Sequence, residues 1–127
     1  MIERIKPAGV YEAKGYSHAV KRGNIVFVAG QVSKDIDGKL VGPGDIVAQV
    51  DQVFRNLKAV VEASGATLAD VVKLNIYTTD LAHYRPHIRE GRDKYFSEFP
   101  PATTLLVVKS LADPNFLLEI DAVALTD

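Results

Sequence analysis

The sequence contains no cysteine among its 127 residues. This absence excludes disulfides, a thiolate nucleophile and thiolate-bound metals, and it fits a reducing compartment. The chain also lacks a run of about 18 consecutive apolar residues, the length that a membrane-spanning helix requires. The amino-terminal segment carries charges at Glu3, Arg4 and Lys6 and has no apolar stretch of signal-peptide length. We therefore expect a cytoplasmic protein with no membrane partner.

Neither sign of charge is in excess. Fifteen Lys and Arg residues stand against sixteen Asp and Glu residues, for a formal net charge of −1, and like charges form no run. Nucleic acids and anionic lipids are bound through clustered cations, so we expect neither as a partner. The remaining composition, 47% hydrophobic and 24% charged, is that of an ordinary globular protein. At this length we expect one domain over residues 1–127.

The first third of the chain predicts a β-hairpin followed by a loop. Ser17–Arg22 has mixed polarity, Gly23-Asn24 supplies turn residues, and Ile25–Ala29 is β-branched and aromatic. The hairpin leads into Gly30-Gln31, where a glycine indicates a bulge or the close approach of another group. Asp35–Gly44 is rich in turn formers and predicts an exposed loop.

The rest of the chain alternates helical and β-rich patterns. Apolar residues spaced by three and four predict an amphipathic helix that begins after Asp45 and stops at Ser64-Gly65. Val71–Thr78 is β-rich with period two and predicts a strand. A second helix is expected over Leu81–Phe96, with Pro86 marking its true start. Two further strands are expected at Thr103–Ser110 and Leu117–Leu125. The order ββαβαββ predicts an α+β fold with two helices on one face of a mixed sheet.

The last two strands carry information about assembly. In Thr103–Ser110, Leu105 and Val107 occupy one face, while Leu106 and Val108 occupy the other. Two helices cover only one face of the sheet, so a second copy of the chain is expected to cover the other. The alternative is a small sandwich or barrel that buries both faces within one chain.

Histidines and acidic residues are the first candidates for chemistry. His83 and His87 lie four residues apart on the second expected helix, but a metal site needs further ligands, so we expect no metal. Glu119 and Asp121 point to the same face of the last strand. There they form either a general acid–base pair, in which burial and repulsion raise one pKa, or a solvated sheet edge.

Six strings follow one another in an order that is typical of one protein family. They are GYSHAV at 15–20, VFVAGQ at 26–31, NLKAVVEASG at 56–65, VKLNIY at 72–77, PATT at 101–104 and LEIDAVA at 118–124. With these strings the sequence resembles the RidA family (reactive intermediate deaminase, also called YjgF) over nearly its whole length.

The resemblance implies a chorismate-mutase-like protomer and a homotrimer, in which the sheets form a central barrel and the helices lie outside. It also implies ligand clefts between subunits and the hydrolysis of small enamines or imines to 2-oxo acids and ammonia. The resemblance implies that no cofactor or metal takes part in this reaction.

The same resemblance assigns roles to individual residues. Glu119 corresponds to the glutamate that positions water, Tyr16 to the tyrosine that closes the cleft, and Gly30 with Gln31 to the backbone that helps to bind substrate. The family's deaminases have an arginine that holds the substrate carboxylate after Pro-Ala, where this chain has Thr103 followed by Thr104. A neutral hydroxyl does not replace a bidentate cationic fork, so the substrate is expected to be altered.

Arg89 stands where family deaminases often have asparagine. It either supplies the missing cation or is a solvated arginine on a helix surface.

Three functions follow from these features. The first is a deaminase or related hydrolase that uses Glu119 and water. The second is a trimer that binds a small metabolite without turnover, which the loss of the arginine favours. The third, the endoribonuclease label of some relatives, requires phosphate contacts that the balanced charge does not favour.

Overall fold

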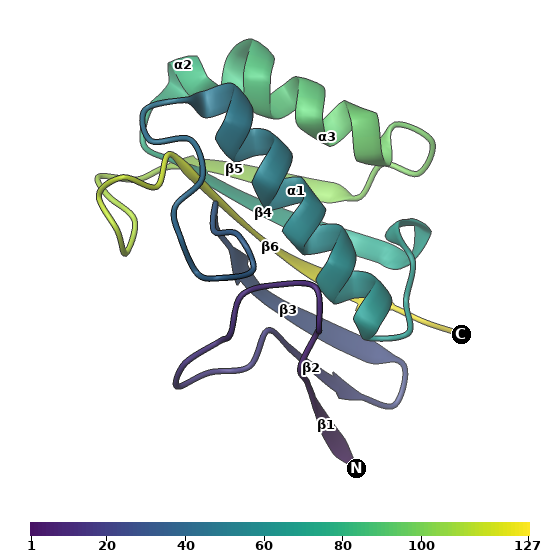
Figure 1. Ribbon diagram of the computed structural model, residues 1–127. Helices are drawn as coiled ribbons and strands as arrows, with labels where there is room; N and C mark the ends of the chain where they lie inside the picture. The colour runs from purple at the N-terminus through teal and green to yellow at the C-terminus, as the bar shows by residue number, and fades with distance from the viewer.

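The computed structural model describes residues 1–127 and shows a single six-stranded sheet with helices packed on one face (Figure 1). The strands are β1 (Ile2–Ile5), β2 (Ala19–Arg22), β3 (Ile25–Gln31), β4 (Val71–Thr78), β5 (Ala102–Val107) and β6 (Leu118–Leu125). The helices are α1 (Ile46–Ala63), α2 (Leu81–His83) and α3 (Arg89–Phe96), with short helical turns at η1 (Leu68–Asp70) and η2 (Tyr84–Ile88). None of these helices is long and apolar enough to cross a membrane.

The sheet has the strand order β1-β2-β3-β6-β4-β5 and is mixed. β4 and β5 are parallel, and every other neighbouring pair is antiparallel. From β2 onward the elements follow the expected order ββαβαββ, so the predicted α+β architecture is confirmed. The sequence prediction missed β1, which pairs with β2 at the edge of the sheet.

Helix α1 covers the middle of the sheet. Asp45 caps its first turn, where the carboxylate accepts a hydrogen bond from the Ala48 backbone N–H at 3.1 Å. The helix ends at Ser64, and Gly65 then takes the left-handed conformation, with φ of +82°. The apolar stripe of α1 packs on the buried face of the sheet, and this face forms one core of 20 buried residues.

The second helical region is broken, which corrects the expected continuous helix. Asp80 caps α2, so the helix begins at Leu81 and not at Pro86. Arg85 then leaves helical geometry, with φ of −111° and ψ of 116°, because the residue before a proline avoids the helical region. The chain becomes regular again in α3.

The face of the sheet opposite the helices remains open. Its apolar side chains include Phe27, 59% exposed, and Leu106, 50% exposed. On β6 the alternation is strict, because Leu118 and Ile120 are buried beneath the helices while Glu119 points to the open face. The prediction of an uncovered apolar face is thus confirmed, and the alternative sandwich or barrel within one chain is wrong.

Candidate functional site

The centre of the candidate site is the contact between Glu119 on β6 and Gly30 on β3. A Cβ built at residue 30 would lie 2.6 Å from Glu119 Cδ and 2.9 Å from Glu119 Cγ, closer than real Cβ contacts occur. The register of β3 against β6 shifts between Val28 and Gln31, which is the bulge that the glycine indicated. Because residue 30 has no side chain, the Glu119 side chain occupies the space beside its backbone.

Burial changes the acidity of Glu119. The carboxyl is half-buried on the open face of the sheet, and this burial raises its pKa, with a smaller contribution from the charge of Asp121. Asp121 itself accepts hydrogen bonds from Asn75 Nδ2 at 2.8 Å and from Tyr77 Oη at 2.9 Å. The Glu119 carboxyl is thus suited to exchange protons, whereas the Asp121 side chain is occupied by two hydrogen-bond donors.

A buried hydrogen-bond chain connects Gln31 to the segment that carries Tyr16. Gln31 Nε2 donates to the Ala29 carbonyl at 3.0 Å and to His18 Nδ1 at 3.1 Å. His18 Nε2 then donates to the Tyr11 carbonyl at 2.7 Å. These hydrogen bonds fix which ring nitrogen of His18 carries the proton, and they hold residues 11–18 against the end of β3.

Tyr16 and Tyr11 both lie near His18. The ring centroids of Tyr11 and His18 are 4.7 Å apart, and those of Tyr16 and His18 are 5.9 Å apart. Tyr16 is 50% exposed, while Tyr11 is buried and its hydroxyl has no hydrogen-bond partner. Burial raises the pKa of Tyr11, and the proximity of Tyr16 and of Glu119 raises it further. The side chains of Tyr11, Tyr16, His18 and Glu119 therefore lie in one region of the structure.

The structure separates the two threonines of the candidate site. Thr104 lies on the open face, where it accepts a hydrogen bond from Lys73 Nζ at 2.7 Å. Thr103 pairs with the buried Leu74, so it points to the helix side of the sheet. Its hydroxyl donates to the Pro101 carbonyl at 3.0 Å. Within one protomer, the sheet therefore separates Thr103 from Glu119.

Arg89 also lies on the helix side. It is an exposed residue of α3 and makes no ion pair or side-chain hydrogen bond within the protomer. The sheet therefore stands between Arg89 and Glu119. Arg92 is closer to Thr103, and both line a hollow of about 290 Å³ between α3 and β5. The Arg92 guanidinium donates to Tyr84 Oη at 2.7 Å and to Asp93 at 3.0 Å.

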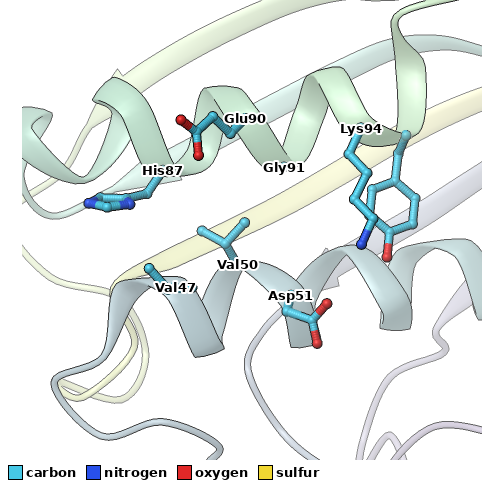
Figure 2. A pocket seen from close by; sticks show the side chains of 8 residues that line it. Val47, Val50, Asp51, His87, Glu90, Gly91 and Lys94 are labelled. Atoms are coloured by element: carbon cyan, nitrogen blue, oxygen red, sulfur yellow. The ribbon is translucent and has the colours of Figure 1, made fainter.

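A separate groove runs between α1 and α3 (Figure 2). Gly91 lets the two helices approach, because a Cβ there would lie 2.9 Å from Phe54 Cε2. His87 and Glu90 line this groove on α3, and Asp51 lines it on α1. The groove lies on the helix side of the sheet, away from Glu119. No group of three metal-binding side chains occurs anywhere in the structure.

Comparison with known proteins agrees with this arrangement. Residues 6–126 match the family described as Endoribonuclease L-PSP. A RutC family protein of Pyrococcus abyssi is 39% identical over 109 residues, which cover 86% of this chain and 84% of that protein. A 2-iminobutanoate/2-iminopropanoate deaminase of Dermatophagoides farinae is 35% identical over 113 residues, covering 88% and 86% of the two chains. The crystal structure of RidA from an Antarctic Psychrobacter species is 36% identical, with a TM-score of 0.89, and covers 98% of this chain and 99% of that one.

The mixed sheet with helices on one face is the α+β fold of the chorismate-mutase-like class, shared with the solved YjgF structure from E. coli. The chain belongs to the Endoribonuclease L-PSP family, in which the RidA and YjgF proteins are found. The resemblance inferred from the sequence is thereby confirmed.

Proposed function

We propose that this protein hydrolyses small imines or enamines, with Glu119 as the proton-transferring group. The observation that carries the proposal is the half-buried Glu119 carboxyl, whose pKa is raised by burial, lying against Gly30 and beside Tyr16 and Tyr11. A carboxyl with a raised pKa accepts and returns a proton more readily near neutral pH than an ordinary one. The deaminase from Dermatophagoides farinae supports this choice among the relatives.

The proposed reaction needs only water and the residues of the chain. The Glu119 carboxylate accepts a proton from water as the water oxygen bonds to the imine carbon, and the C=N π electrons move onto nitrogen. The protonated carboxyl then returns its proton to that nitrogen. Glu119 then moves the hydroxyl proton of the carbinolamine to its nitrogen, and the C–N bond breaks as the C=O bond forms, which releases ammonia. No cofactor or metal enters these steps.

We propose further that the complete site lies between copies of the chain in a homotrimer. Thr103 and Arg89 are on the helix side of the sheet, while Glu119 is on the open side. A contribution from either of the first two residues to the Glu119 site therefore has to come from a neighbouring copy. The exposed Phe27 and Leu106 on the open face give such a copy an apolar surface to cover.

The experiment generates 2-iminopropionate with a pyridoxal-phosphate lyase and measures its conversion to pyruvate with and without this protein. The proposal predicts an acceleration over the uncatalysed reaction. Because Thr103 replaces the expected arginine, we propose that the preferred substrate is altered, and an imine that lacks an α-carboxylate belongs in the same assay. No acceleration with either imine contradicts the proposal.

The second candidate function is binding of a small metabolite without turnover. The observation that favours it is Thr103, which bonds to the Pro101 carbonyl and offers no cation. Binding of a 2-oxo acid without imine hydrolysis is the result that this function predicts. For either function we propose a cytoplasmic location, although one yeast relative is named as mitochondrial.

A further inference from the structure

Lys34 is a lysine that no acidic side chain neutralises. The ion pairs of the structure join Arg55 to Asp51 and Arg92 to Asp93, and Lys34 takes part in neither. Its ammonium makes no side-chain hydrogen bond. It lies instead over two aromatic rings, with Nζ 5.3 Å from the centroid of Tyr11 and 5.8 Å from the centroid of Phe116. The two rings hold the cation in place and leave its N–H donors free.

The backbone of Lys34 is fixed from a second direction. Asn56 on α1 is buried, and its Nδ2 donates to the Val32 carbonyl at 3.0 Å and to the Lys34 carbonyl at 2.9 Å. Lys34 also forms an isolated bridge with Leu40 across the following loop. The backbone of Lys34 is thus held by α1 and by the loop, and the two aromatic rings position its ammonium, which together give the rigidity that a binding group requires.

The hydroxyl of Tyr11 is the second unusual group of this region. Tyr11 is 2% exposed, and its Oη has no partner, although a buried hydroxyl without a hydrogen bond destabilises a fold. Tyr11 and Lys34 line the same hollow, of about 360 Å³, and Tyr16 lines it as well. A tyrosine with an unpaired hydroxyl and a lysine without an acidic partner therefore line the same hollow, beside the tyrosine of the candidate site.

We propose that Lys34 and Tyr11 form a subsite for a small carboxylate, which enters as the Tyr16 side chain moves aside. The Lys34 ammonium takes one carboxylate oxygen and the Tyr11 hydroxyl donates to the other. In this subsite the cation that holds the carboxylate is Lys34, after the end of β3, and not residue 103. In this respect the subsite rests on the proposed function. The binding measurement below does not require turnover, so the two proposals fail separately.

Acidic residues at the rim limit the ligands that fit. Glu12 and Asp37 line the same hollow and repel anions, but neither lies within ion-pair distance of Lys34. A dianion meets more of this repulsion than a monoanion does. The subsite is therefore suited to a monocarboxylate whose remaining atoms are uncharged.

The test measures binding of pyruvate and of its neutral amide, pyruvamide, to the full-length protein by titration calorimetry. The unmodified protein is expected to prefer pyruvate. Lys34→Met is expected to weaken pyruvate binding by about tenfold while changing pyruvamide binding by less than about twofold, because only the carboxylate loses a charge-assisted hydrogen bond. Lys34→Arg is expected to retain most of the affinity for pyruvate.

Two further variants sharpen the test. Lys14→Met removes an exposed lysine of the same hollow that contacts no ring, and it is expected to change pyruvate binding by less than about threefold. Tyr11→Phe is expected to weaken pyruvate binding by about threefold to tenfold without lowering the melting temperature.

The results separate this proposal from the proposed function. Equal pyruvate binding by Lys34→Met and the unmodified protein, or an equal loss in Lys14→Met, overturns the subsite even if imines are hydrolysed. Unchanged pyruvate binding by Tyr11→Phe shows that Tyr11 is not part of the subsite. A selective loss in Lys34→Met without imine hydrolysis supports the subsite and contradicts the proposed function.

Discussion

Glu119 lies against the backbone of Gly30, in space that any side chain at residue 30 would occupy. The contact joins two central strands at a bulge, and it places a half-buried carboxyl on the open face of the sheet. Only the far end of the Glu119 side chain would have to move to admit a Cβ, and this end is the reactive group. The contact therefore matters more for activity than for stability.

Gly30→Ala tests this contact. We expect the added methyl to displace the Glu119 carboxylate and to reduce the rate of imine hydrolysis by about a hundredfold or more, since small misplacements of catalytic groups have effects of this size. The melting temperature should change little. Gly9→Ala is the control, because a Cβ at residue 9 meets nothing within 4 Å. Equal activity of Gly30→Ala and Gly9→Ala would show that the contact has no catalytic role.

The raised pKa of Glu119 predicts a pH-dependent cost to stability. Because the folded pKa lies above the ordinary value, the folded state binds the proton more tightly than the unfolded chain does. The loss of stability is complete above the pKa that Glu119 has in the folded protein, and it disappears as pH falls through the ordinary pKa of a glutamate. Glu119→Gln should thus be more stable than the unmodified protein at pH 7, with the advantage lost near pH 4. Urea unfolding at both values measures this, and an equal difference at both would contradict it.

The open face of the sheet predicts the assembly. Phe27→Asp places a charge on the apolar surface that a second copy is expected to cover, so it should shift the solution mass from trimer toward monomer. Ile36→Asp is the matched control, because Ile36 is 61% exposed but lies in a loop. Light scattering coupled to gel filtration gives the masses. An unmodified protein that is monomeric at micromolar concentration would sink the prediction.

Thr103→Arg tests the missing anchor. If a neighbouring copy brings residue 103 to the Glu119 site, an arginine there should accelerate hydrolysis of 2-iminopropionate by about tenfold to a hundredfold. This factor corresponds to the free energy of a hydrogen bond to a charged group. Arg89→Ala is measured beside it. A loss of activity in Arg89→Ala would show that this arginine already holds the carboxylate, whereas no gain in Thr103→Arg would place the anchor elsewhere.

Periodicity predicted most of the fold, because the buried stripe of α1 and the alternation of β6 are local consequences of one apolar face. It missed β1, which is short and has Glu3 and Arg4 at its centre. Gln49 is not part of the apolar stripe of α1, yet its side chain is buried and bonds to the Gly42 and Asn115 carbonyls. Such contacts depend on loops that come together only in the folded chain.

For the candidate site, the family resemblance named Glu119, Tyr16 and Gly30. In the structure Glu119 contacts Gly30, and both Tyr16 and Glu119 lie near Tyr11. Sequence reasoning could not find Tyr11 or Lys34, because one lies in an irregular segment and the other after a strand end, where no repeat links them. A buried hydroxyl without a partner is visible only in coordinates. The side of the sheet on which Thr103 lies likewise depends on its register with Leu74.

The most direct test of the account is the rate of pyruvate release from 2-iminopropionate by Glu119→Gln. The unmodified protein and Glu98→Gln are measured beside it, because Glu98 is an exposed glutamate in the turn after α3. The account predicts that Glu119→Gln loses at least about a hundredfold in rate, as proton-transferring groups do, while Glu98→Gln keeps the full rate. If Glu119→Gln releases pyruvate as fast as the unmodified protein, Glu119 does not carry the reaction and the proposed function is wrong.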